Sequence, residues 1–264
     1  LLSASASADS SDYHRPSVIH LGSELDPKDP WLRSSDSPEN AIRRLLQHLE
    51  DSKTGKTLLK KARKKAKRSG KNLMDILRAG KNSLLDTTLV RRFTPDRPDR
   101  IHYQVKSKIL INRRHITINA ILDLAHELTH YAFREQFNPY EMQFTASEFI
   151  RSTVEGKGGE VEAYLIECKV LDDLYPQYSK EMSNCARVRD ERGKLSKSLG
   201  IQEFYKVGDH YPIFAEAAET MNVTTDTFAE LSREEGQFIS SAYGLPYPVA
   251  AIKEFQIIMG KVCQ

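Results

Sequence analysis

The feature that most constrains this chain is a pair of histidines four residues apart, in the sequence His126-Glu127-Leu128-Thr129-His130. On an α-helix this spacing places both imidazoles on one face, so that two ring nitrogens can reach one metal ion. Apolar residues around the pair recur at helical spacing: Ile121, Leu122, Ala125, Ala132 and Phe133. The segment therefore predicts a buried metal-binding helix. The alternative is a helix whose histidines bond to backbone and whose glutamate is solvated.

The residue types in this segment favour zinc hydrolysis. Zinc accepts imidazole nitrogens as ligands and lowers the pKa of a bound water to about 7. Glu127 follows the first histidine directly and is placed to take a proton from such a water. The sequence thus predicts a zinc-dependent hydrolase that cleaves peptide bonds in a peptide or protein substrate, with Glu127 as general base.

A hydrolytic zinc site needs a third protein ligand and one open position. A metzincin would have Gly and His where this chain has Phe133 and Gln136, so that arrangement is not expected. The candidates are four downstream carboxylates: Glu155, Glu160, Glu162 and Glu167.

Glu160 is the preferred third ligand. It begins a predicted helix directly after Gly158-Gly159, which would let the backbone approach the first helix closely, and Ala163 on the same face leaves room for the imidazoles. Glu162 lies about 200° away on the helical wheel and is expected to face solvent. Glu155, in the preceding loop, is the second choice of ligand. The alternative for Glu160 is that its carboxylate binds no metal and only interacts with the helix dipole.

Three segments of the chain together resemble the gluzincin metallopeptidases: Ile116–Asn119, Ala125–Ala132 and Glu160–Tyr164. In that family two helices carry H-E-x-x-H and E-x-x-A-D, and an edge strand precedes the first. The resemblance implies a zinc ion held by His126, His130 and Glu160, with Glu127 as general base. It also implies that a strand around Ile109–Asn112 binds an extended substrate by strand addition.

The resemblance has one departure and one addition. Tyr164 stands where the family has Asp, which leaves the hydrogen-bonding partner of the ligand histidines unassigned. Upstream, Ser52–Leu59 is similar to a segment that precedes the zinc helix in some bacterial effector-type peptidases. Hydrolysis also needs a donor for the oxyanion, and the candidates are His210 and Tyr211 at a predicted helix start and Tyr243 and Tyr247 in a loop. The alternative for each is an ordinary packing or capping role.

The periodicity predicts an α+β fold, with a small, mostly antiparallel sheet packed on a predominantly helical body. Residues 1–36 are expected to be irregular, 37–100 to form a helical subdomain and 101–264 a catalytic domain. Expected helices cover about 37–49, 54–68, 73–77, 119–135, 160–174, 178–188, 212–221, 226–241 and 248–259. Strands are expected at 101–105, 109–111 and 116–118, with a hairpin turn near Asn112-Arg113.

A basic stretch supports competing functions. Lys60–Lys71 contains eight basic residues and no acid, which could bind nucleic acid or an anionic polymer. Its lysines also fit the outer face of an amphipathic helix with Leu58, Ala62 and Ala66 inside, and no aromatics are interleaved, so nucleic acid is not the expected partner. A catalytically inactive zincin-fold binding module is a third alternative.

The start of the chain and its cysteines bear on the cellular compartment of the protein. Ala6-Ser7-Ala8 after two leucines resembles the cleavage site of a secretory signal, which predicts export to the periplasm or medium; a cytoplasmic protein with an irregular Ser/Ala-rich start is the alternative. No apolar run is long enough to span a bilayer. Cys168 and Cys185 flank Pro176 almost symmetrically, so an antiparallel helical hairpin would bring them level as a disulfide. Two buried free thiols are the alternative.

Overall fold

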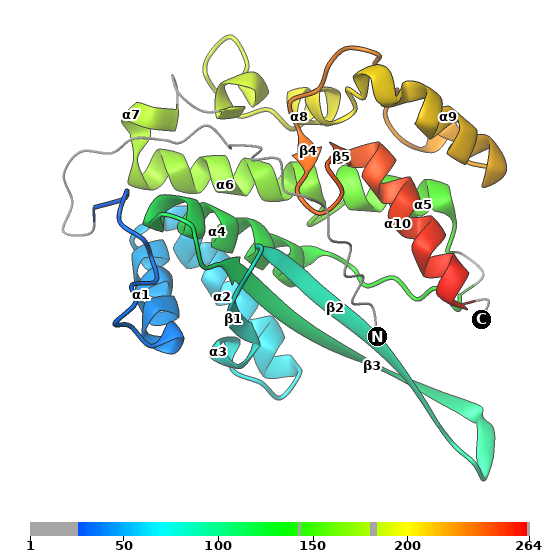
Figure 1. The fold of residues 1–264 in the computed structure, drawn as a ribbon, viewed down its shortest axis with the longest axis horizontal. Coiled ribbons are helices and arrows are strands. Elements are labelled where there is room, and N and C mark those ends of the chain that lie inside the picture. Colours follow the sequence, from blue (N-terminus) through cyan, green and yellow to red (C-terminus); the bar gives the residue numbers. More distant parts are fainter. Residues whose placement is uncertain (1–25, 142–143, 180–183, 263–264) are drawn as a thin grey trace. The chain divides into compact units, whose positions relative to one another are not determined.

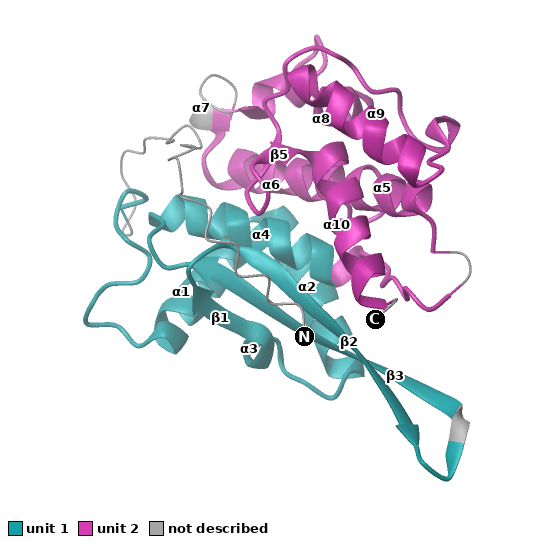
Figure 2. Cartoon of the chain, turned by 45° about the vertical axis from the view of Figure 1, so that its right-hand side comes forward, with its two compact units in different colours: residues 1–131 teal, residues 132–264 magenta. Residues whose placement is uncertain are grey.

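The computed structural model describes residues 26–141, 144–179 and 184–262. The chain divides after Tyr131 into two compact units, which Figure 2 shows in different colours. The division falls inside a helix, so the last residues of that helix, Ala132 and Phe133, belong to the second unit. The boundary expected at residue 101 lies within a strand of the first unit.

The first two helices are confirmed, and both are capped by serine. Helix α1 spans Pro38–Asp51, and α2 spans Lys53–Arg68. Ser52, which is fully buried, ends α1 and begins α2, and its side chain accepts a hydrogen bond from Gly55 N at 2.9 Å. The part of the expected irregular lead-in that is described, 26–36, consists of turns and bends, and it buries Trp31.

The third expected helix is wrong in its second half. Helix α3 (Leu73–Ile76) is a single turn, and the chain continues as strand β1 (Leu77–Gly80). A short apolar run does not separate a helix turn from a buried strand, and here Leu77, which is 1% exposed, packs as a strand residue.

The first unit contains a mixed three-stranded sheet in the order β1-β3-β2, which Figure 1 shows beside α1 to α3. Strand β2 spans Leu84–Thr94 and β3 spans Arg97–Asn112. The pair β2–β3 is antiparallel, whereas β1 runs parallel to Ile109–Asn112. The α+β class is therefore confirmed, and the two longer strands extend as a twisted ribbon well past β1.

Two expectations about this sheet are wrong. The hairpin turn lies between Thr94 and Arg97, not near Asn112-Arg113. In place of the expected strand at 116–118, Ile116 forms an isolated bridge with Pro30 and helix α4 (Thr117–Phe133) then begins. Ile118 belongs to the helical spacing of the residues that follow it, and a three-residue alternation cannot outweigh that spacing. Ile109–Asn112 is paired on both sides, by β1 and by β2, so no substrate strand can be added there.

The second unit is mainly helical. Its elements are α5 (Ala146–Val154), α6 (Glu160–Leu174), α7 (Pro176–Ser179), η1 (Asn184–Val188), α8 (Lys197–Phe204), η2 (Gly208–His210), α9 (Tyr211–Thr220), η3 (Thr225–Thr227), β4 (Ile239–Ser240), β5 (Leu245–Pro246) and α10 (Tyr247–Val262). The expected helices at 160–174, 212–221 and 248–259 are confirmed as α6, α9 and α10. Across both units, no described helix is both long and apolar enough to cross a membrane.

Two expected helices of this unit are wrong. After η3 the chain is irregular, and Phe228 and Phe238 stack on the aromatic rings at the end of α8, with Phe204 and Phe238 centroids 4.4 Å apart. Their burial therefore does not need a helix at 226–241. The helix expected over 178–188 is replaced by α7 and the 3₁₀ turn η1, with residues 180–183 outside the described ranges.

The predicted disulfide is confirmed. Cys168 on α6 and Cys185 on η1 are bonded, with Cα atoms 5.7 Å apart and a sequence separation of 17. The bond ties the middle of α6 to the segment that returns after it.

We expect Gly55→Ala to lower the free energy of unfolding by about 1–3 kcal/mol, because an added Cβ would lie 2.2 Å from Leu49 O and force α1 and α2 apart. Gly260→Ala is the control. No atom lies within 4 Å of its added Cβ on α10, so it should stabilise the protein by about 0.5–1 kcal/mol. Chemical denaturation measures both; a neutral Gly55→Ala would show that α1 and α2 do not require this approach.

Cys168→Ser should lower the free energy of unfolding by about 3 kcal/mol, because it releases a closed loop of this length in the unfolded chain. Cys263→Ser, which removes a cysteine outside the described residues, is the control and should change little. Non-reducing peptide mapping of the native protein should show Cys168 and Cys185 linked. Three reactive thiols in that map would contradict the bridge.

Candidate metal centre

Helix α4 buries the histidine pair as predicted. His126, Glu127 and His130 are 6%, 8% and 5% exposed, and the two imidazole centroids lie 4.7 Å apart with ring planes at 86°. Thr129 on the same helix satisfies its hydroxyl by donating to Ala125 O at 2.8 Å. The helix therefore presents two adjacent imidazoles from an apolar interior, which is the geometry that the motif predicts.

A second carboxylate on α4 was missed by the sequence reasoning. Asp123 is 5% exposed, lies three residues before His126 and four before Glu127, and its Oδ2 is 2.9 Å from His115 Nε2. An acid on the apolar face of the helix was the signal that could have identified it. On the helix Asp123 shares the face of both residues, one turn earlier.

Glu160 is the first residue of α6, and the loop before it makes the close approach that the glycines predicted. A Cβ on Gly158, whose φ is +67°, would lie 2.4 Å from Arg134 N and 2.8 Å from Phe133 C. Only glycine allows this approach to the backbone at the end of α4. Glu160 itself is buried, with 9% exposure, and its position at the helix start suits a negative charge.

Arg134 holds the Glu160 carboxylate in place and was not identified from the sequence. Its guanidinium donates to Glu160 Oε1 at 2.9 Å, to Gly158 O at 3.2 Å and to Thr153 O at 3.3 Å. These bonds join the residue directly after α4 to the end of α5 and the start of α6. No sequence pattern predicts them, because they depend on the path of the loop 155–159.

The two histidines and Glu160 form a group suited to a metal ion. One ligand atom from each of His126, His130 and Glu160 lies within 4.8 Å of the others, and this is the only such group of His, Cys, Asp or Glu found among the described residues. Two imidazole nitrogens and one carboxylate oxygen are the donor set of a three-ligand hydrolytic zinc site. The residues present therefore fit zinc.

The other candidate carboxylates lie outside this group. Glu162 was expected to face solvent, but its Oε2 accepts a hydrogen bond from Gly158 N at 2.6 Å and so stabilises the glycine loop. Glu155 caps the C-terminus of α5, and burial raises the pKa of its carboxyl. Glu167 is buried further along α6.

Tyr243 is the oxyanion candidate that interacts electrostatically with Glu254, a carboxylate that Glu160 also influences. It lies between β4 and β5, where Gly244 N donates to Ser240 O at 2.8 Å to close the turn. Burial, together with the nearby carboxylate of Glu254, raises the pKa of Tyr243 to about 12, so its hydroxyl remains a donor at neutral pH. Burial also raises the pKa of Glu254. The charge of Arg134 lowers this pKa, whereas the charge of Glu160 raises it further.

The remaining candidates are placed differently. Tyr247 stacks on Phe204 at 5.1 Å, and Phe204 contacts Tyr164, which lies one turn after Glu160 on α6. Tyr211 is covered by the guanidinium of Arg233 at 4.2 Å, and His210 precedes it in η2. His210 and Tyr211 therefore lie in a different local structure from Tyr243 and Tyr247.

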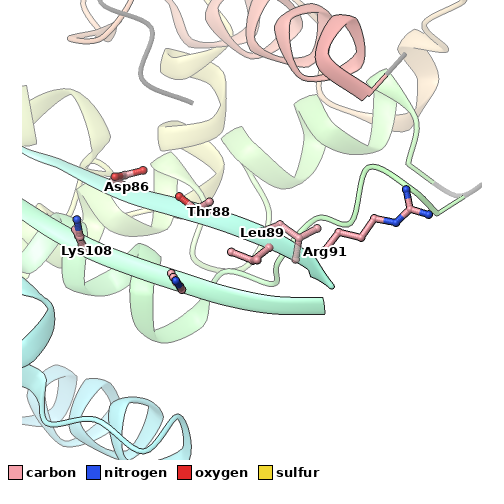
Figure 3. A pocket seen from close by; sticks show the side chains of 7 residues that line it. Asp86, Thr88, Leu89, Arg91 and Lys108 are labelled. Carbon is pink, nitrogen blue, oxygen red and sulfur yellow. The ribbon is translucent and has the colours of Figure 1, made fainter. Parts of the chain in front are cut away.

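A separate hollow lies on the β2–β3 ribbon, shown in Figure 3. Residues from both strands line it: Asp86, Thr88, Leu89, Val90, Arg91, Lys106 and Lys108. It contains none of the predicted site residues.

Comparison of the chain with family models, with curated proteins and with solved structures finds no match. The chemistry of the site must therefore be argued from its own residues.

Arg134→Ala should weaken zinc binding by about 10- to 100-fold, because the Glu160 carboxylate loses the partner that orients it. Arg189→Ala is a matched control. It breaks another ion pair of the same unit, with Asp172 at 2.6 Å, and should leave zinc affinity unchanged. Competition with a chelator of known affinity measures the zinc Kd of both variants. Equal Kd values for the two would show that the Arg134–Glu160 pair is only structural.

Proposed function

We propose that the protein is a zinc-dependent hydrolase that cleaves peptide bonds. The observation that carries this proposal is the buried group of His126, His130 and Glu160, with Glu127 adjacent to the first histidine on α4. A structural metal site has no need of a carboxylate beside its ligands, whereas hydrolysis needs a base there. The resemblance to gluzincins supports the same assignment.

The roles of the residues follow from their chemistry. Zinc bound to the three side chains would lower the pKa of a water ligand and polarise a carbonyl oxygen. Glu127 would accept the proton of the attacking water and pass it to the leaving amine. The half-buried phenol of Tyr243, a donor at neutral pH, is the preferred group to stabilise the developing oxyanion. Arg134 does not react but orients Glu160.

An extended peptide substrate would need a sheet edge that is still open. Because Ile109–Asn112 lies in the central strand, the strand addition implied by the resemblance must use another strand. Strand β2 lies at the edge of the sheet, and its outer side has no partner among the described strands. We propose β2 as the strand that aligns the substrate.

Two substitutions separate metal binding from catalysis. Glu127→Gln should retain about one zinc per chain and lose nearly all hydrolysis of a diverse peptide library, because it removes the proton acceptor and leaves the ligands. His126→Ala should lose both the zinc and the activity. Zinc content by elemental analysis and library cleavage by mass spectrometry measure the two properties.

The exposed Glu135, just after α4, provides the control: Glu135→Gln should keep zinc and activity. Activity of Glu127→Gln within tenfold of the unmodified protein would place the base elsewhere. A protein that binds zinc but cleaves no library peptide would instead be an inactive binding module of the same fold.

A further inference from the structure

Helix α2 carries a surface that the proposed function does not use. Its buried side consists of Gly55, Leu58, Leu59, Ala62 and Ala66. The exposed lysines on the remainder of the helix form what we call the lysine stripe: Lys53, Lys56, Lys60, Lys64 and Lys67. At 3.6 residues per turn these five positions fall within a sector of about 80°, and the rise from Lys53 to Lys67 makes the stripe about 21 Å long.

The flanks of the stripe are also cationic. Lys61, Arg63 and Arg68 are exposed beside it, and α2 contains no acidic residue. Of the five stripe lysines and these three flanking residues, Arg63 forms an ion pair, with Glu50, within the described part of the chain. The stripe therefore keeps an uncompensated positive field, although the net charge of the whole chain is only +3.

This concentration of charge is unfavourable for the helix itself. Like charges spaced by three or four residues repel one another, and lysines near an N-terminus oppose the helix dipole. Lys53 and Lys56 lie in the first turn of α2, where no acid is present. A polyanionic partner would relieve this repulsion along the whole stripe.

We propose that the lysine stripe docks the protein on an anionic lipid surface. Clusters of four to eight basic residues on one side of an amphipathic helix suit this partner, because each lysine near the surface adds to the attraction. The stripe is straight, and no large apolar side chain lies in it, so the contact is electrostatic and requires no insertion into the bilayer.

The composition of the surface favours lipid over nucleic acid. Specific recognition of nucleic acids uses arginine, which binds phosphates and guanines bidentately, together with aromatic or amide side chains that contact bases. The exposed side of α2 has six lysines against two arginines, and no aromatic, Asn or Gln. Lysine acts as a point charge without fixed geometry and therefore matches a diffuse layer of headgroups.

The test is co-sedimentation of the full chain with vesicles of phosphatidylcholine alone or with about 30% phosphatidylglycerol, at low and high salt. The triple variant Lys60→Gln, Lys64→Gln, Lys67→Gln removes three stripe charges. The control, Lys169→Gln, Lys194→Gln, Lys197→Gln, removes three exposed charges of the second unit and so has the same net charge.

We expect binding to anionic vesicles only, weakened by salt, and at least tenfold weaker in the stripe variant than in the control. Equal partitioning of the two variants would overturn the proposal, as would equal binding to neutral vesicles. Binding to duplex DNA without binding to anionic vesicles would also overturn it and identify nucleic acid as the partner. None of these outcomes depends on zinc or on hydrolysis, so the proposal stands or fails separately from the proposed function.

Discussion

The burial of ionisable side chains on one apolar helix is the constraint on which the site depends. Asp123, His126, Glu127 and His130 are each less than 9% exposed on α4, although most of the helix is apolar. A buried charge is tolerated only when it is paired or coordinates a metal, and Asp123 illustrates the first case through His115. The two imidazoles and Glu160 have the composition of the second case, a group that coordinates a metal.

Capped and strongly periodic helices could be predicted from the sequence. The Ser37-Pro38 start of α1, the glycine pair before α6 and the apolar spacing of α10 each combine a boundary signal with a helical period, and each places its helix where the structure has it. The disulfide could also be predicted, since it required only that Cys168 and Cys185 lie equally far from a chain reversal. The exact form of the returning segment did not matter.

The parts that were missed depend on contacts distant in sequence. Strand β2 could not be predicted, because Leu84–Thr94 has no sustained alternation of apolar and polar residues and much of it is exposed. Its structure follows from pairing with β3. The irregular segment 228–238 is held by Phe228 and Phe238, which pack on the end of α8, a contact that local helical spacing cannot reveal. Arg134 belongs to the same class, because its partners lie 19 to 26 residues away.

The arrangement around Glu160 explains how the carboxylate that we propose as the third ligand can be oriented before any metal binds. Three features of the second unit act on it: the N-terminus of α6 favours its negative charge, Arg134 binds its Oε1, and Gly158 fixes the preceding loop against residues 133–134. The bond to Arg134 does not compete with metal binding, because a carboxylate has two oxygens and about four lone-pair sites. Orientation by neighbours lowers the cost of ordering a ligand on binding. Arg134 is therefore better regarded as part of the centre than as a neighbouring surface charge.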